Sequence, residues 1–198
     1  AKVGLRAAYE ALGQNYTDGA SYNFHNEFFY LIPSLHLSYR TNTMHNFNFS
    51  YTLRRTTPSA DNLSPRPLYG IDSYSIGNPD LQCTYTHHLT AGWTKFFMKF
   101  GSVGAQFYYS KNTDERSTLA DVTYSPFYGH VVNYSMPMNI GDSWNTGLDL
   151  NLTYRPTSFI NIRFNGGVRY NNEDFTFRDD HYETRNWSYK FRLNAWAK

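Results

Sequence analysis

The side chains best suited to binding chemistry lie in the long connections of this chain, between its alternating stretches. Aromatic rings offer flat faces to sugars or aromatic ligands and lose little conformational entropy when they are fixed. A guanidinium can pair with an anionic group. Packing of one loop against another is the alternative explanation for the same residues. The ligand-binding candidates are Arg66, Tyr69, Tyr74, Tyr124, Phe127, Tyr128 and Trp144.

Catalytic and metal sites are not predicted. Ser73, Ser75, His130 and Asp142 could supply a nucleophile and a base, but no Gly-x-Ser-x-Gly motif frames them. Segment 178–183, with the sequence RDDHYE, could bind a divalent cation through oxygen ligands, although solvated loop charges explain it better. A single cysteine excludes an intramolecular disulfide and a CxxC zinc site. We therefore expect a protein that is not an enzyme and has no metal and no cofactor.

The elements that must position the candidate loops are eight stretches in which apolar and polar residues alternate. Three of the connections between them are tight, at residues 41–44, 97–99 and 156–158. The other four, at residues 13–28, 55–84, 112–144 and 172–184, are long and rich in Asn, Asp, Ser and Tyr. Short turns at one end and long loops at the other are typical of an up-and-down transmembrane β-barrel. The stretches are residues 2–12, 29–40, 45–54, 85–96, 100–111, 145–155, 159–171 and 185–198.

The alternation predicts one face against lipid and one face against water. In residues 145–155, Leu148, Leu150 and Leu152 share one face, and Asp149 and Asn151 lie on the other. A soluble antiparallel sheet shows the same alternation. The apolar faces, however, carry Tyr and Trp near both ends and mostly aliphatic residues between them, as the two interfaces of a bilayer require. We therefore predict an outer-membrane barrel whose polar face lines a lumen.

Composition agrees with this prediction and excludes other classes. The mean hydropathy is −0.62, and no apolar run reaches the ~18 residues of a membrane helix. A barrel escapes that test because only every second residue faces lipid. Aromatic residues make up 19% of the chain, which favours strands. The net charge of +2 is too small to indicate a nucleic-acid partner.

Three segments resemble one known family. Tyr51-Thr-Leu-Arg-Arg-Thr-Thr-Pro58 is followed by Gly77-Asn-Pro-Asp-Leu81 and then by Asn139-Ile-Gly141 with Gly147-Leu-Asp-Leu-Asn-Leu-Thr-Tyr-Arg-Pro156. In order and spacing they resemble the strand-to-loop segment, the "GNPxL" loop and the "YRP" strand of TonB-dependent outer-membrane receptors of the Bacteroidetes type. Residues 82–84, QCT, depart from the Pro-Glu usual after "GNPxL".

The resemblance implies a barrel of about 22 strands with an N-terminal plug domain, which imports a scarce nutrient with energy passed on by TonB. We therefore expect residues 1–198 to be part of one barrel domain, with about eight of its strands, and the plug and the closing strand to lie elsewhere. The expected partners are outer-membrane lipid, the plug, TonB and an extracellular nutrient (a glycan, a peptide, an iron chelate or a vitamin). The alternative is a self-contained eight-strand outer-membrane barrel with a structural or adhesive role.

Overall fold

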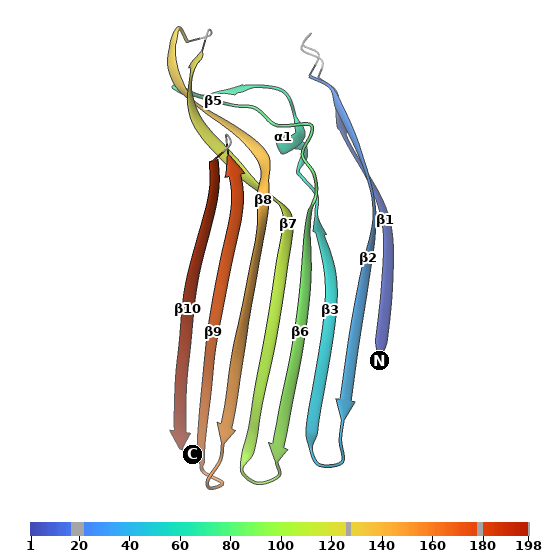
Figure 1. The fold of residues 1–198 in the computed structure, drawn as a ribbon, viewed down its shortest axis with the longest axis vertical. Helices are drawn as coiled ribbons and strands as arrows, with labels where there is room; N and C mark the ends of the chain where they lie inside the picture. The colour runs from blue at the N-terminus through green and yellow to red at the C-terminus, as the bar shows by residue number, and fades with distance from the viewer. Residues whose placement is uncertain (17–21, 126–127, 178–179, 198) are drawn as a thin grey trace.

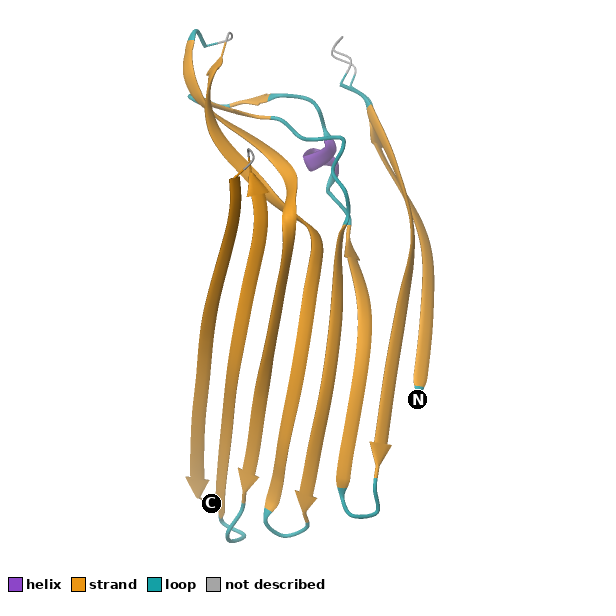
Figure 2. Ribbon diagram, viewed as in Figure 1, coloured by secondary structure: helices purple, strands orange, loops and turns teal. Residues whose placement is uncertain are grey.

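The chain is almost entirely β-structure in the computed structural model, which describes residues 1–16, 22–125, 128–177 and 180–197 (Figures 1 and 2). The connection between β3 and β6 holds the helix α1 (Ala60–Leu63) and two short strands, β4 (Leu68–Tyr69) and β5 (Ser73–Ser75). Since α1 has four residues, the described part of the chain contains no helix long enough to cross a membrane. The long strands are β1 (Lys2–Gln14), β2 (Phe24–Arg40), β3 (His45–Thr56), β6 (Thr84–Phe97), β7 (Gly101–Ser125), β8 (His130–Tyr154), β9 (Ile160–Phe177) and β10 (Asp180–Ala197).

Each long strand is antiparallel to the next along the chain, which confirms the predicted meander. The tight turns gather at one end of the sheet, here called the turn end, and the longer connections gather at the other, the loop end (Figure 1). Among the described residues β1 pairs only with β2, and β10 only with β9. The sheet is therefore open, which does not favour the self-contained eight-strand barrel.

Most of the connection predicted at residues 112–144 is strand instead of loop. β7 and β8 pair from Arg116 and Asn139 as far as Ser125 and His130, and together they form a long hairpin beyond the rest of the sheet (Figure 1). The polar composition of this segment suggested a loop, but cross-strand pairing satisfies its backbone groups at any composition. The same reason extends β9 and β10 into the predicted connection 172–184.

A β-bulge marks the point where this hairpin leaves the sheet. The register shifts between Asn112 and Arg116, and Asp114 takes the left-handed conformation with φ 55°. The side chain of Asn139 holds the bulge, because its Nδ2 donates to the carbonyl oxygen of Asp114 over 2.7 Å. Its Oδ1 accepts from the backbone N–H of Gln82 over 2.8 Å. Asn139 thus ties the connection between β3 and β6 to the base of the hairpin.

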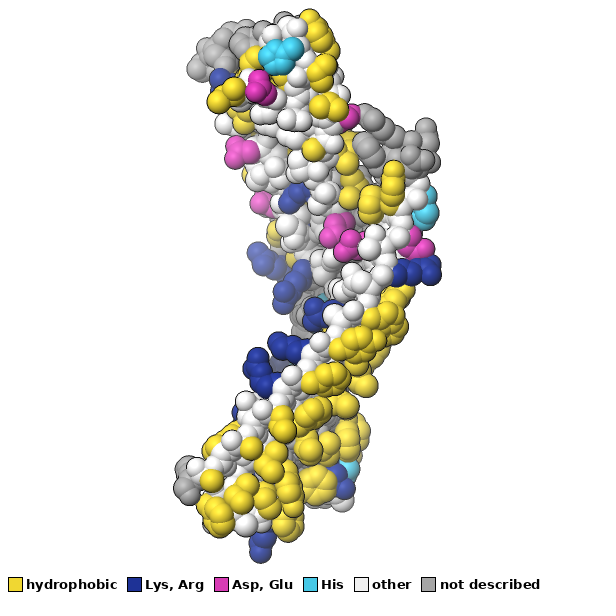
Figure 3. Space-filling model, turned by 90° about the vertical axis from the view of Figure 1, so that its left-hand side faces the viewer, with side chains coloured by type: hydrophobic (Ala, Val, Ile, Leu, Met, Phe, Trp, Pro, Cys, Tyr) yellow, Lys and Arg dark blue, Asp and Glu magenta, His cyan; other side chains and the backbone are white. Residues whose placement is uncertain are grey.

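The eight long strands up to this level, here called the wall, form one layer with two different faces. Leu150 is 46% exposed on the apolar face, beside its equally exposed neighbours Leu148 and Leu152. Viewed along the β10 side, apolar side chains cover one face of the wall and Lys and Arg project from the other (Figure 3). Polar residues also meet across strands, as Asn151 does with Asn165. The alternation therefore predicted the faces correctly.

Aromatic side chains run in a row across the apolar face where the wall ends. The ring centroids of Tyr109 and Trp144 are 6.2 Å apart, those of Trp144 and Tyr170 are 5.3 Å apart, and those of Tyr170 and Trp187 are 4.8 Å apart. The row crosses β7, β8, β9 and β10. The register aligns Tyr109, Tyr170 and Trp187 through Thr146 of β8, and Trp144 lies two residues along β8 from Thr146. Rings with one polar edge suit the boundary between hydrocarbon and water.

Part of the wall is joined by side chains instead of backbone pairs. The register between β2 and β3 stops at Ser34 and Thr52, and Arg55 fills the space beyond it with only 2% of its side chain exposed. Its guanidinium lies 3.8 Å from the ring centroid of Tyr30, and its Nη2 donates to Sγ of Cys83 over 2.9 Å. The single cysteine is therefore a buried partner of this arginine.

A small apolar core anchors the connection between β3 and β6 to β2. Phe24, Leu63 and Leu81 are buried together. The chain passes very close to α1 at Gly77, where an added Cβ would lie 2.4 Å from the carbonyl oxygen of Ser64. The "GNPxL" segment is thus a packing device: its glycine permits the close approach and its leucine enters the core.

Candidate functional site

Tyrosines from two separate connections meet at the far end of the β7–β8 hairpin. β5 adds to β8 as a parallel pair, which aligns Tyr74 with Tyr134. Their ring centroids lie 4.9 Å apart, and Tyr69 lies 5.9 Å from Tyr74 and 6.2 Å from Tyr128. We call Tyr69, Tyr74, Tyr128 and Tyr134 the tyrosine cluster. The structure thus brings together three of the predicted candidates with Tyr134, which belongs to the same predicted loop as Tyr128.

Polar contacts hold this cluster in place. The hydroxyl of Tyr128 donates to the carbonyl oxygen of Gly70, and Nε2 of His130 lies 3.3 Å from Oδ1 of Asp72. Burial raises the pKa of Tyr134, and the neighbouring Tyr74 raises it further. Loop-on-loop packing therefore accounts for part of the cluster. Tyr69 nevertheless remains 51% exposed and presents ring surface outside the packed part.

Arg66 lines a cavity of about 410 Å³ between the end of β1, α1 and the hairpin. Its guanidinium lies 5.0 Å from the ring centroid of Tyr16, whose hydroxyl is 2.8 Å from Oγ of Ser64. Oε1 of Gln14, in the same lining, is buried without a hydrogen-bond partner among the described residues. A buried acceptor, an arginine and an aromatic ring suit a ligand that carries hydroxyl groups.

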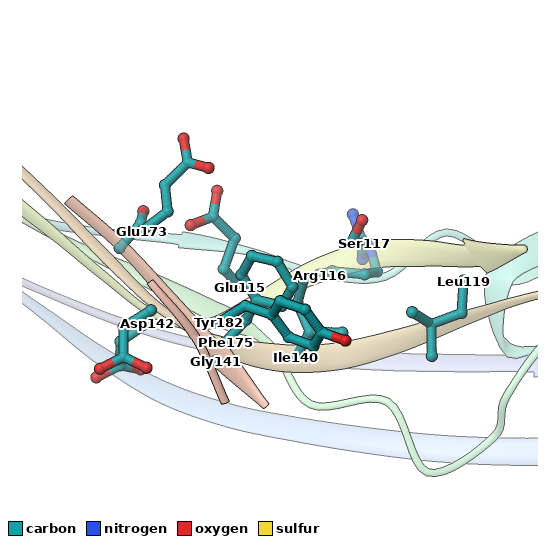
Figure 4. Close-up of a pocket in the computed structure, with 12 residues that line it drawn as sticks. Glu115, Arg116, Ser117, Leu119, Ile140, Gly141, Asp142, Glu173, Phe175 and Tyr182 are labelled. Carbon is teal, nitrogen blue, oxygen red and sulfur yellow. The ribbon is translucent and has the colours of Figure 1, made fainter. Parts of the chain in front are cut away.

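A second cavity, of about 430 Å³, lies where β7, β8, β9 and β10 leave the wall. The rings of Phe175 and Tyr182 stack with centroids 5.2 Å apart. The carboxylates of Glu115 and Glu173 project to one side of these rings, and Asp142 projects to the other (Figure 4). An apolar surface beside carboxylates suits a group that combines positive charge with an apolar body.

Sequence reasoning missed this second cavity because its residues belong to two connections that were predicted as loops. Only the cross-strand register places Gly141 opposite Phe175, and Phe175 opposite Tyr182. Within the described residues no three acidic, histidine or cysteine side chains are grouped to hold a metal ion. Residues 178 and 179 of the acidic segment lie outside the described part.

The remaining candidates lie apart from both cavities. Trp144 stands in the aromatic row, a position that favours a membrane interface over ligand binding. Tyr124 is 62% exposed near the tip of the hairpin, and Phe127 lies outside the described residues. The candidate site is therefore the tyrosine cluster together with the Arg66 cavity.

Comparisons with known proteins agree with the geometry. Residues 1–197 match a family model described as "Outer membrane protein beta-barrel family". No curated protein matches the chain. The siderophore receptor PirA from Pseudomonas aeruginosa has a similar structure, with a TM-score of 0.61 and 14% identity over 98% of this chain and 41% of that one.

Two further solved structures are similar. A double mutant of the Serratia marcescens hemophore receptor HasR, in complex with its hemophore HasA and heme, gives a TM-score of 0.62 at 12% identity, over 87% of this chain and 30% of that one. PirA from Acinetobacter baumannii gives 0.55 at 12% identity, over 98% and 38%. Identities this low establish the fold alone, and the chain spans less than half the length of each of these receptors.

Proposed function

Because this chain belongs to the outer membrane protein beta-barrel family, we propose that it forms part of the barrel wall of a TonB-dependent receptor of the Bacteroidetes type. In this proposal the receptor imports a nutrient across the outer membrane of a Gram-negative cell. The three sequence segments that resemble such receptors support the subtype. Receptors of this kind bind and transport their cargo, so no enzyme activity is proposed.

One observation carries the proposal: the wall has an apolar and a polar face, and structured extensions lie at only one of its two ends. The apolar face suits lipid, and the polar face suits a wet lumen. The hairpin, α1, β4 and β5 all lie at the loop end, and only tight turns lie at the other end (Figure 1). A receptor needs this asymmetry, because cargo capture requires a structured surface on the extracellular side, whereas the periplasmic turns only connect neighbouring strands.

The cargo surface in this proposal is the tyrosine cluster with the Arg66 cavity below it. Exposed ring surface on Tyr69 offers stacking to sugars or to aromatic groups. Arg66 and the buried acceptor of Gln14 offer hydrogen bonds. These groups fit a glycan, a peptide, an iron chelate or a vitamin, and a hydroxyl-rich cargo fits them best.

The proposal also includes parts of a longer protein. β1 and β10 each have an edge without a paired strand among the described residues, which further barrel strands would cover. We propose that residues 1–198 form part of one barrel domain, and that a plug domain, the contact with TonB and the closing strand belong to the rest of that protein.

Impermeant maleimide labelling of the full-length receptor on intact cells tests the orientation. Cysteines at the exposed positions Asp72 and Tyr124, at the loop end, should react. Cysteines at the exposed positions Asn42 and Ser158, in the tight turns, should react only after the outer membrane is permeabilised. The reverse pattern would refute the proposal that the tyrosine cluster meets cargo.

Uptake of single nutrients by a strain that carries the full-length gene tests the cargo surface. Tyr74→Ala should lower uptake of the transported nutrient, since it removes the ring that joins Tyr69 to Tyr134. Tyr74→Phe is the matched control, because it keeps the ring and should keep uptake. Equal uptake by both variants at equal surface abundance would exclude the cluster from cargo binding.

A further inference from the structure

The polar face of β7, β8, β9 and β10 carries more positive than negative side chains, and the contacts of two of its arginines involve no acidic group. Arg163 lies over the ring of Trp196, with 5.6 Å from Cζ to the ring centroid. Nε of Arg169 donates to the hydroxyl of Tyr108 over 2.8 Å. Neither contact neutralises a charge. On β10, Lys190 and Arg192 are exposed and lie on the same face as Arg163 and Arg169.

The register places these two cations in two adjacent rows across the four strands. One row runs from Gln106 through Asp149 and Gly167 to Lys190. The next row runs from Gly104 through Asn151 and Asn165 to Arg192. Side chains in such rows are neighbours on one face of a sheet. Each row therefore has a cation at its β10 end and at least one carboxamide side chain on another strand.

The missing side chain of Gly167 leaves room between the rows. A Cβ there would lie 2.4 Å from Oδ1 of Asp149, so that carboxylate lies directly over the glycine. The result is a hollow of about 230 Å³ in the polar face of the wall. Its lining includes Gln106, Asp149, Asn151, Asn165, Lys190 and Arg192.

The hydrogen-bonding groups of the hollow select the class of ligand. Lys190 and Arg192 donate only, and the guanidinium fork matches a carboxylate or a phosphate. Each carboxamide adds two N–H donors. The two cations exceed the one carboxylate of Asp149, so the lining carries a net positive charge. A volume below the ~300 Å³ of ordinary ligand pockets suits one oxyanionic group instead of a whole cargo molecule.

We propose that this hollow is an oxyanion-binding subsite of the lumen wall, with Lys190 and Arg192 as the charged ligands and Asn151 and Asn165 as hydrogen-bond donors. The proposal rests on the proposed function to the extent that the polar face must line a water-filled lumen. The oxyanion is a carboxylate or a phosphate. It comes either from a free solute or from an acidic side chain of a protein segment inside the lumen.

Charge-selective thiol labelling of the full-length receptor in native outer-membrane vesicles tests the subsite. A cysteine in place of Asn165 reports on the hollow. A cysteine in place of Asn48 is the matched control, because Asn48 pairs with the neutral Ser38 and Gly92 on the same face. Each is treated with an anionic and a cationic methanethiosulfonate reagent of similar size, and the unsubstituted receptor gives the background.

For each position we compare the labelling rate of the anionic reagent with that of the cationic one. We expect this ratio to be about tenfold higher at residue 165 than at residue 48, since a focused potential raises the local anion concentration by that order. The double variant Lys190→Gln with Arg192→Gln should abolish this preference. An equal ratio at both positions, or a ratio that the double variant leaves unchanged, would overturn the subsite.

Two further arms identify the source of the oxyanion. If inorganic phosphate slows labelling at residue 165, the subsite takes a free solute. If residue 165 is unreactive and the double variant makes it reactive, a carboxylate of the protein occupies the subsite. Residue 165 unreactive in both backgrounds would contradict the proposal. Failure of residue 48 to react with either reagent would instead refute a water-lined polar face, and with it the proposed function.

Discussion

The wall and the extension beyond it, formed by the hairpin of residues 113–142 and the connection 57–83, are held together in different ways. The wall is a single layer: Leu150 and its neighbours remain exposed on the apolar face, and the backbone ladder joins the strands except where Arg55 fills the space between β2 and β3. The extension has buried side chains, such as Leu63 and Val132, and specific side-chain contacts. Lipid must therefore stabilise the wall, whereas the extension must supply its own packing.

The largest expected effect separates the two faces of the wall. Leu150→Arg should destabilise the folded barrel by about 2–4 kcal/mol, because it places a cation near the middle of the hydrocarbon layer. Asn151→Arg, one residue along and on the polar face, should cost close to zero. Folding of the full-length protein into bilayers, followed by denaturant titration, measures both. Equal costs would mean that the two faces have been assigned wrongly.

The next effect concerns the small core of the extension. Leu63→Ala should cost about 2–3 kcal/mol, since Leu63 is fully buried against Phe24 and Leu81 and the site can collapse only partly. The loss should appear as faster proteolysis of residues 57–83, with the wall unaffected. Leu68→Ala is the control, because Leu68 is 60% exposed. Cleavage at the same rate in both variants would show that this core does not hold the connection.

These two regions also differ in how well the sequence predicts them. Alternation gave the eight strands of the wall and their faces, because a one-residue shift would send Leu150 to the lumen and Asn151 to lipid. Nothing comparable constrains residues 113–142, whose polar residues can face water on either side. Their strands depend on pairing between residues such as Arg116 and Asn139, which no local pattern encodes. The tyrosines of the candidate site were found by residue type, but their contact depends on the parallel pair of β5 with β8, which aligns Tyr74 with Tyr134.

A smaller effect is expected at the junction of the two regions. Asn139→Ala should cost about 0.5–1.5 kcal/mol, because it removes the acceptor of the backbone N–H of Gln82 and one of the two donors to the carbonyl oxygen of Asp114, which keeps the hydroxyl of Thr84. Asn139→Asp should cost less, since a carboxylate still accepts from Gln82. Hydrogen exchange at the amide of Gln82 measures the difference. If the amide exchanges equally fast in both variants, the acceptor is not what holds the connection.

The smallest effect is expected at Asp114, the left-handed residue of the bulge. Asp114→Gly should change stability by less than about 1 kcal/mol, because glycine adopts positive φ without strain but adds entropy to the unfolded chain. Asp114→Ala should be less stable than Asp114→Gly by about 1 kcal/mol, since a Cβ is disfavoured in this conformation. The amides of residues 113–142 should therefore be better protected from hydrogen exchange in Asp114→Gly than in Asp114→Ala, and the protection of the wall should be the same in both variants. The opposite ranking would mean that the positive φ at residue 114 does not limit the stability of the hairpin, and that its side-chain contacts decide the order instead.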